Sequence, residues 1–213
     1  MQRFKAYVKQ GELGKARTDL DHALDLDSTF KLARLQRANL RLQSGDCTGA
    51  TTDYEAVLRA DPTKKDAQAR LPESRKCAMH LEQADREASL GRWPEVSRHL
   101  EEATAPGRAV SSVPALVLAS RAQLEQGHID DAIAMAARAL KVDARSLDAL
   151  AMRAQALYQR GDTEQALTHT QQALRLDPEY EEAMRLHRKL RQVSRLSTRA
   201  SGLESSGDHA GAA

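Results

Sequence analysis

The sequence predicts an all-α protein made of helix pairs that stack one after another as an α-solenoid. Three observations support this class. Six segments centred on a glycine align without gaps, apolar residues recur between them at helical spacing, and only 3% of the residues are aromatic. A single large globule usually fills its centre with aromatic side chains, whereas a chain rich in Ala and Leu suits thin layers of closely packed helices.

The turn defines the repeat. The segments VKQGELGKA, LQSGDCTGA, ASLGRWPEV, LEQGHIDDA, YQRGDTEQA and ESSGDHAGA share one glycine position, occupied by Gly11, Gly45, Gly91, Gly127, Gly161 and Gly207. Glycine adopts the left-handed conformation at the end of a helix without steric penalty. We therefore expect each glycine to end the first helix of a pair.

Mostly small residues flank the turn at fixed distances. Seven residues before the glycine stand Phe4, Ala38, Ala84, Ser120, Ala154 and Ala200, and five after it stand Ala16, Ala50, Val96, Ala132, Ala166 and Ala212. Small side chains let paired helices approach closely, so Ala132 and Ala166 are predicted to pack at helix crossings. The motifs DLDS, RADP, KVDA and RLDP close four units, and proline, where present, stops the second helix.

Two of the glycine intervals are longer than the others. The spacing is 34 or 36 residues except between Gly45 and Gly91 and between Gly161 and Gly207, where it is 46. The extra residues amount to about three helical turns and precede a first helix. They predict long connecting helices at about 64–90 and 180–201, with Pro72 kinking or breaking the first near Leu71.

The unit resembles the tetratricopeptide repeat (TPR), a helix-turn-helix of 34 residues, over nearly the whole chain. It departs from that family in lacking a Trp early in the first helix and in closing two repeats on Ser28 and Ala144 instead of proline. The resemblance implies a right-handed superhelix whose concave face is lined by the first helices. Because both end repeats look incomplete, we expect the chain to be a piece of a longer array.

Two stretches resemble one particular group of TPR proteins. FKLARLQRANLRLQSGDCTGATTDYEAVLRADP and LYQRGDTEQALTHTQQALRLDPEYEEAMRLHRKLRQVSRL are similar to the third and sixth repeats of the endoplasmic-reticulum J-domain co-chaperones, the family of the 58-kDa inhibitor of the interferon-induced protein kinase. The resemblance implies that residues 1–62 end a first TPR subdomain. Residues 63–178 would then form a second subdomain of three repeats behind a long helix, and residues 179–213 would begin a third.

The same resemblance implies a function. The chain would bind unfolded or misfolded client proteins through an apolar surface, for delivery to an Hsp70 recruited by a J domain. No His-Pro-Asp tripeptide, the signature of a J domain, occurs in the sequence. The family also implies a protein kinase as a partner and the endoplasmic-reticulum lumen as the compartment, with the cytoplasm as the alternative. The alternative function is a generic scaffold that binds a defined folded partner or a linear peptide.

The concave face is the candidate client site. Counting back from the turn glycine places Leu32, Leu35, Asn39 and Leu42 on this face in the second repeat, and Val117, Leu118, Met152 and Tyr158 on it in the fourth and fifth. The second repeat is the predicted site, because its leucines offer apolar contact and Asn39 can bond a peptide backbone. The mostly apolar set differs from the Lys, Arg and Asn that clamp an acidic C-terminal peptide. For any single residue, the alternative is packing between neighbouring helices.

Catalytic, metal and cofactor sites are not expected. The sequence has no recognisable nucleophile arrangement, no Gly-rich phosphate loop and no one-turn pair of histidines with a nearby acid. Cys47 and Cys77 fit no zinc or redox motif, and two unpaired thiols are expected. No apolar run approaches the roughly 18 residues that span a bilayer, so membrane insertion is not expected.

One local run of charge stands out in a chain whose formal net charge is only +2. It consists of Arg185, Arg188, Lys189, Arg191, Arg195 and Arg199. No aromatic residues interleave for base stacking, so nucleic acid is not an expected partner. We interpret the run as a solvated face of the second long helix, with binding of nucleic acid or a kinase as the alternative.

Overall fold

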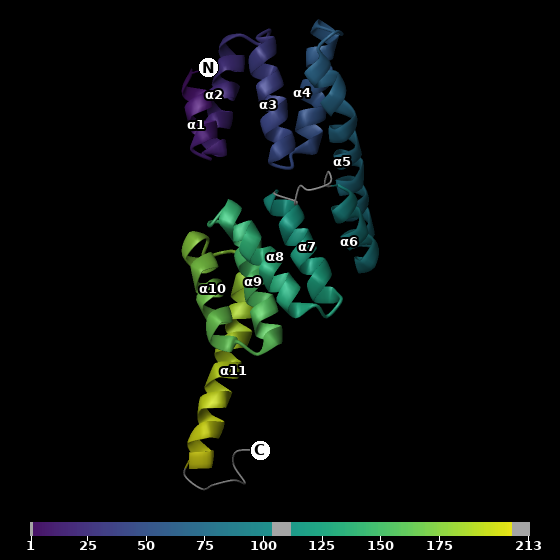
Figure 1. Ribbon diagram of the computed structural model, residues 1–213. Helices are drawn as coiled ribbons and strands as arrows, with labels where there is room; N and C mark the ends of the chain where they lie inside the picture. Colours follow the sequence, from purple (N-terminus) through teal and green to yellow (C-terminus); the bar gives the residue numbers. More distant parts are fainter. Residues whose placement is uncertain (1, 104–111, 206–213) are drawn as a thin grey trace. The chain divides into compact units, whose positions relative to one another are not determined.

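The structure is a computed structural model, and it describes residues 2–103 and 112–205 (Figure 1). Within those ranges the chain forms helices and no strand, which confirms the predicted all-α class. The helices are α1 (Gln2–Lys9), α2 (Leu13–Leu26), α3 (Lys31–Gln43), α4 (Cys47–Ala60), α5 (Lys65–Ser89), α6 (Trp93–Glu102), α7 (Val113–Glu125), α8 (Ile129–Val142), α9 (Leu147–Arg160), α10 (Thr163–Leu176) and α11 (Glu181–Ser205).

The chain divides into two compact units, Met1–Ser112 and Val113–Ala213. In the first unit every helix packs on the next one along the chain, from α1 to α6. In the second unit α7 to α11 do the same. Packing between sequence neighbours is the pattern of a solenoid. The predicted subdomain limits after residues 62 and 178 rest on a family register, and they stay a prediction.

The first helices α1, α3, α5, α7 and α9 each end one or two residues before the predicted glycine. Gly11, Gly45, Gly91, Gly127 and Gly161 all have a positive φ, between 69° and 96°. Gly161 shows why: as the left-handed cap of α9, it lets the next amide, that of Asp162, bond the carbonyl of Leu157 at 2.9 Å. The helix pairs therefore follow the predicted register, whereas Gly207 lies outside the described residues.

The residues on either side of the turn lie buried where paired helices cross. The pairs Ala38/Ala50, Ala84/Val96, Ser120/Ala132 and Ala154/Ala166 are all 0% exposed. At the crossing of α7 and α8, the Ser120 hydroxyl donates a hydrogen bond of 2.7 Å to the main-chain carbonyl of Ala132. A side chain that reaches the backbone of the partner helix leaves no room for a larger residue. The prediction that Ala132 and Ala166 pack between helices is confirmed.

Both long connecting helices are present. α5 and α11 each have 25 residues, close to the predicted ranges. Of the predicted kink or break at Pro72, the break does not occur, since α5 continues through this residue. Proline removes one main-chain hydrogen bond of α5. Packing offsets this loss, since Ala67 and Cys77, on the two sides of Pro72, are buried in the core cluster between α3, α4 and α5.

Cys47 and Cys77 form a disulfide, so the expectation of two unpaired thiols is wrong. Their Cα atoms are 5.8 Å apart, within the usual range for a disulfide. Cys47 begins α4 and Cys77 lies in the middle of α5, and the packing of these helices brings the two sulfur atoms together. Linear spacing does not show this proximity, because it depends on where α5 crosses α4.

The first unit buries a carboxylate among arginines. Asp53 of α4 is 1% exposed, and three arginines of α3 surround it. Arg37 binds both of its oxygens, at 2.7 and 2.8 Å, and Arg41 binds one of them at 2.8 Å. Arg3 and Asp19 make the same contact between α1 and α2, one repeat earlier. These bonds satisfy a charge whose burial is otherwise expensive.

The pair α5/α6 instead buries two histidines. His80 and His99 are 6% and 8% exposed, and their Nδ1 atoms are 3.1 Å apart. Arg98 lies 3.1 Å from His99 Nε2, and the Glu102 carboxylate lies 3.3 Å from His80 Nε2. One proton arrangement satisfies all three contacts: Arg98 donates to His99, His99 donates to His80, and His80 donates to Glu102. Both imidazoles are then neutral.

This pair predicts a loss of stability in acid. Burial, the main cause, together with His99, Lys76 and Arg98, lowers the pKa of His80 below its ordinary value, although Glu102 acts to raise it. The unfolded chain therefore binds a proton at His80 more readily, so the free energy of unfolding should fall as the pH drops below about 6.5. We expect His80→Gln to show a shallower fall, measured by urea unfolding between about pH 5 and 8. Identical pH dependence in both proteins would contradict the assignment.

Candidate functional site: the first-helix face of the second unit

In the second unit the first helices of successive repeats touch one another. α7 contacts α9, and α9 contacts α11, in addition to the contacts that each makes with its sequence neighbours. These three helices therefore form one layer of the unit. α8 packs on α7 and α9, and α10 packs on α9 and α11 (Figure 1). We call the outer side of the α7–α9–α11 layer the first-helix face.

Tyr180 helps to hold the layer together. It lies just before α11, and its hydroxyl donates to Asp148 of α9 at 2.7 Å and lies 3.0 Å from the carboxylate of Glu182. Burial raises the pKa of the Tyr180 hydroxyl, and the two carboxylates raise it further. The phenol therefore stays protonated and remains a donor between α9 and α11.

All four predicted residues of the second unit lie on α7 and α9 and are partly exposed. Val117 and Leu118 lie on α7. Met152 of α9 packs against the cluster of Leu124, Ala132 and Ala156 and keeps part of its surface accessible. Since α7 contacts α9, the structure brings these apolar groups onto adjacent helices.

Tyr158 marks the side of α9 that is nearest to α11. Its ring packs against the cluster that contains Leu157 and Leu186, and the ammonium group of Lys189 lies 4.9 Å from the ring centre. A cation over the face of a tyrosine is attracted by the ring, by about 0.5–1 kcal/mol at an exposed site. The first-helix face thus has apolar groups on α7, and a tyrosine of α9 beside a cation of α11 at its other side.

The predicted site in the second repeat is mostly closed. Leu35 and Leu42 are 2% and 8% exposed and belong to the core cluster, so their assignment to an open surface is wrong. The reason is the long helix: Leu71, Ala78 and Leu81 of α5 pack against this same cluster. Leu32 is 47% exposed, and the side-chain oxygen of Asn39 accepts a hydrogen bond of 2.7 Å from the Tyr54 hydroxyl. Only Leu32 and the amide nitrogen of Asn39 remain candidates there.

A second set of exposed apolar residues was not predicted from the sequence. Leu26, Val142 and Leu176 are 77%, 57% and 38% exposed, and each is the last residue of a second helix. The signal was present in the closing motifs, which place an apolar residue directly before the aspartate in DLDS, KVDA and RLDP. These residues lie on second helices and so provide matched controls for tests of the first-helix face.

The chemistry of this surface is that of binding. In the described ranges no group of three or more His, Cys, Asp or Glu side chains is arranged to hold a metal ion. No helix in that part of the chain is both long enough and apolar enough to cross a membrane. The surface offers apolar side chains, one aromatic ring and several cations, which suits contact with another polypeptide.

Antiparallel helix pairs stacked in series, with their first helices in one layer, define a helical-repeat scaffold for protein–protein interaction. The chain belongs to the tetratricopeptide repeat family: the family model described as "Tetratricopeptide repeat" matches residues 1–65 and 117–181, more than half of the chain. The unmatched centre contains α5 and α6, the pair with the long helix and the buried histidines.

Individual proteins and solved structures also match this chain. "DnaJ homolog subfamily C member 3" of Bos taurus is 33% identical over 75 residues, which are 34% of this chain and 15% of that protein. The crystal structure of the P58(IPK) TPR domain matches with a TM-score of 0.79 and 22% identity, over 96% of this chain and 57% of that one.

The second TPR domain of human RPAP3, solved in complex with the HSP70 peptide SGPTIEEVD, has a TM-score of 0.51 and 14% identity, over 56% of this chain and 98% of that one. At such identities both structural likenesses show the fold, and the fold is the one predicted. The present chain spans only part of the length of the first two relatives.

Proposed function

We propose that this TPR module binds unfolded or misfolded protein chains as part of a co-chaperone, through the first-helix face of the second unit. The observation that carries the proposal is the set of partly exposed apolar side chains on adjacent helices, Val117 and Leu118 on α7 and Met152 and Tyr158 on α9. Apolar contact without a fixed pattern of hydrogen bonds suits clients of varied sequence. Leu32 of the first unit is a second, smaller contact.

The likeness to co-chaperone TPR regions supports this role. A matched structure is the P58(IPK) TPR domain, and a matched sequence is a DnaJ homolog of subfamily C. On this basis, clients held by the repeats would be passed to an Hsp70 by a J domain that is not in this sequence. A protein kinase is a further partner proposed from the same likeness.

The second candidate is a scaffold for a linear peptide or a defined folded partner. It is favoured by the cationic side of the first-helix face, where Lys189 lies over Tyr158. The RPAP3 domain, which shares the fold, was solved with an HSP70 peptide that ends in acidic residues. Against it stand the apolar residues at the groove positions of α7 and α9, where a carboxylate clamp needs cations and amides.

The disulfide supports an oxidising compartment, and we propose the endoplasmic-reticulum lumen, with the cytoplasm as the alternative. Disulfides persist in oxidising compartments and are rare in the cytosol. Cys47 is 1% exposed and Cys77 is 9% exposed, so the bond lies inside the core cluster of the first unit.

Removing this bond should weaken the fold measurably. The cysteines are 30 residues apart, and closing a loop of that size stabilises a chain by about 3–4 kcal/mol in the chain-entropy account. We expect dithiothreitol to lower the free energy of unfolding by about 3 kcal/mol, measured with urea, and to leave a Cys47→Ala/Cys77→Ala control unchanged. A cysteine in a disulfide cannot be alkylated. If both cysteines are alkylated when cells are treated before lysis, the disulfide is absent there and the lumenal assignment is wrong.

The client site is tested by matched aspartate substitutions. The probe is reduced and alkylated α-lactalbumin, a permanently unfolded chain that needs no reductant in the assay. We expect Leu118→Asp to weaken binding about tenfold, because a lost apolar contact of roughly 1.4 kcal/mol corresponds to that factor. Val142→Asp replaces an exposed apolar residue at the end of α8 and serves as the control, with an expected change below about twofold.

Leu32→Asp distinguishes the two units. If Leu32→Asp abolishes binding and Leu118→Asp does not, the client site lies in the first unit. If neither substitution matters and a short peptide or a folded protein binds tightly instead, the scaffold function replaces the co-chaperone function. The buried Leu35 is unsuitable for such a test, because an aspartate there would disrupt the core.

A further inference from the structure

The basic run predicted from the sequence forms one exposed face of α11. Successive residues of a helix are separated by about 100°, so Arg188, Arg191, Arg195 and Arg199 fall on the same side. All four are exposed. The opposite side carries Ala183, Leu186 and Leu190, which are buried. We call the four arginines the α11 basic face.

The part of α11 that carries these cations has no acidic residue. Between residues 183 and 203 the sequence contains no Asp or Glu. Among the side chains that the structure describes, no carboxylate pairs with any of the four arginines. Some exposed arginines outside α11 do have partners: Arg75 pairs with Glu55 at 2.8 Å, and Arg160 pairs with Asp130 at 3.2 Å. The α11 basic face thus gathers four exposed arginines, none with a described carboxylate partner, on one side of one helix.

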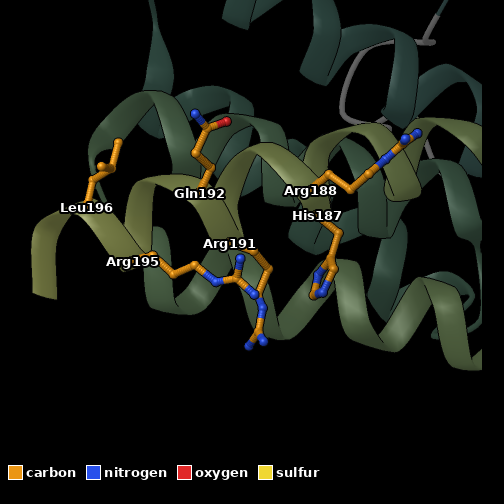
Figure 2. Close-up of a pocket in the computed structure, with 6 residues that line it drawn as sticks. All are labelled: His187, Arg188, Arg191, Gln192, Arg195 and Leu196. Atoms are coloured by element: carbon orange, nitrogen blue, oxygen red, sulfur yellow. The ribbon is translucent and has the colours of Figure 1, made fainter. Parts of the chain in front are cut away.

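Three of the four arginines also line a groove. His187, Arg188, Arg191, Gln192, Arg195 and Leu196 line a groove with a volume of about 550 Å³. Figure 2 shows His187, Arg191 and Arg195 projecting to the same side of α11. The Thr170 hydroxyl of α10 donates its proton to the Leu167 carbonyl, so His187 Nδ1, 2.9 Å away, donates to that hydroxyl. Burial lowers the pKa of His187, as does the nearby Arg191. The imidazole thus stays neutral and fixes one wall, while the guanidinium groups supply the charge.

We propose that the α11 basic face is a docking surface for an acidic, extended segment of a partner protein. The three intervals between the four arginines are each about one helical turn, and the set spans about 16 Å. An extended chain covers that distance in about five residues, with alternate side chains on one side. Carboxylates on such a segment match the guanidinium groups, whose planar forks bind carboxylates in a bidentate manner.

The observations favour a protein over a nucleic acid or a membrane surface. No Phe, Tyr or Trp lies within α11 to stack on bases. The apolar side of the first half of α11 is buried against α9 and α10, so it has no free apolar face there to enter a bilayer. The proposal is independent of the client site, which uses apolar residues of α7 and α9.

The test measures binding of a fluorescein-labelled peptide of about twelve residues that alternates glutamate and serine. The variant is Arg191→Gln/Arg195→Gln in the whole chain, and its matched control is Arg75→Gln/Arg86→Gln on α5, which makes the same change in net charge on the other long helix. We expect the α11 variant to bind about tenfold more weakly and the control to bind like the parent. The affinity of Arg191→Lys/Arg195→Lys for the peptide should lie between those of the parent and the Gln variant. Lysine keeps the positive charge but lacks the planar guanidinium group that binds a carboxylate in a bidentate manner.

Three results would overturn the proposal. The first is an α11 variant that binds the peptide as well as the parent does. The second is an equal loss in the α5 control, which would reduce the effect to net charge. The third is tighter binding of a single-stranded oligonucleotide of the same charge that also depends on Arg191 and Arg195, which would make the face a nucleic-acid site. Circular dichroism of each variant confirms that the exposed substitutions leave the helices intact.

Discussion

The structure depends on the close approach of the two helices in each repeat. At the crossing of α7 and α8 the approach is close enough for the Ser120 hydroxyl to bond the main-chain carbonyl of Ala132 at 2.7 Å. Small side chains on both sides of each turn permit this approach, and a glycine with positive φ reverses the chain between them. Once the crossing is set, the periodicity of the helix decides which residues are buried and which form a surface.

Polar contacts then make the repeats different from one another. This chain, with only 3% aromatic residues, carries ion pairs and histidines between the paired helices. Asp53 with three arginines joins α3 to α4, and His80 with His99 joins α5 to α6. Such contacts are satisfied only in one register, because a shift by one residue would leave a buried charge or imidazole without its partner. They therefore favour a single arrangement of helices with little aromatic core.

The sequence predicted local features well and long-range ones poorly. Gly11, Gly45, Gly91, Gly127 and Gly161 gave the turns, because a left-handed cap is a local requirement. The Cys47–Cys77 bond and the burial of Leu35 and Leu42 were not predicted. Both depend on where α5 lies over α3 and α4, and its path follows from the packing of a 25-residue helix.

For the candidate site too, the local features could be predicted from the sequence and the contacts between helices could not. Helical periodicity placed Val117 and Leu118 on a partly exposed face, and this is a property of α7 alone. The contact of Lys189 with Tyr158 and the groove lined by His187 and Arg191 required the packing of α11 on α9 and α10. A charge run read from sequence as a solvated face thus becomes a surface of defined shape only in the folded unit (Figure 2).

The central claim is that small residues at the crossings determine the repeat register. Two alanines of α8 test it most directly, since Ala132 is 0% exposed at the crossing and Ala134 is exposed on the same helix. In urea unfolding, Ala132→Leu should lower the free energy of unfolding by roughly 1–3 kcal/mol, because the added volume overpacks the crossing. Ala134→Leu should change it by less than about 0.5 kcal/mol. Equal stability of the two variants would contradict the claim.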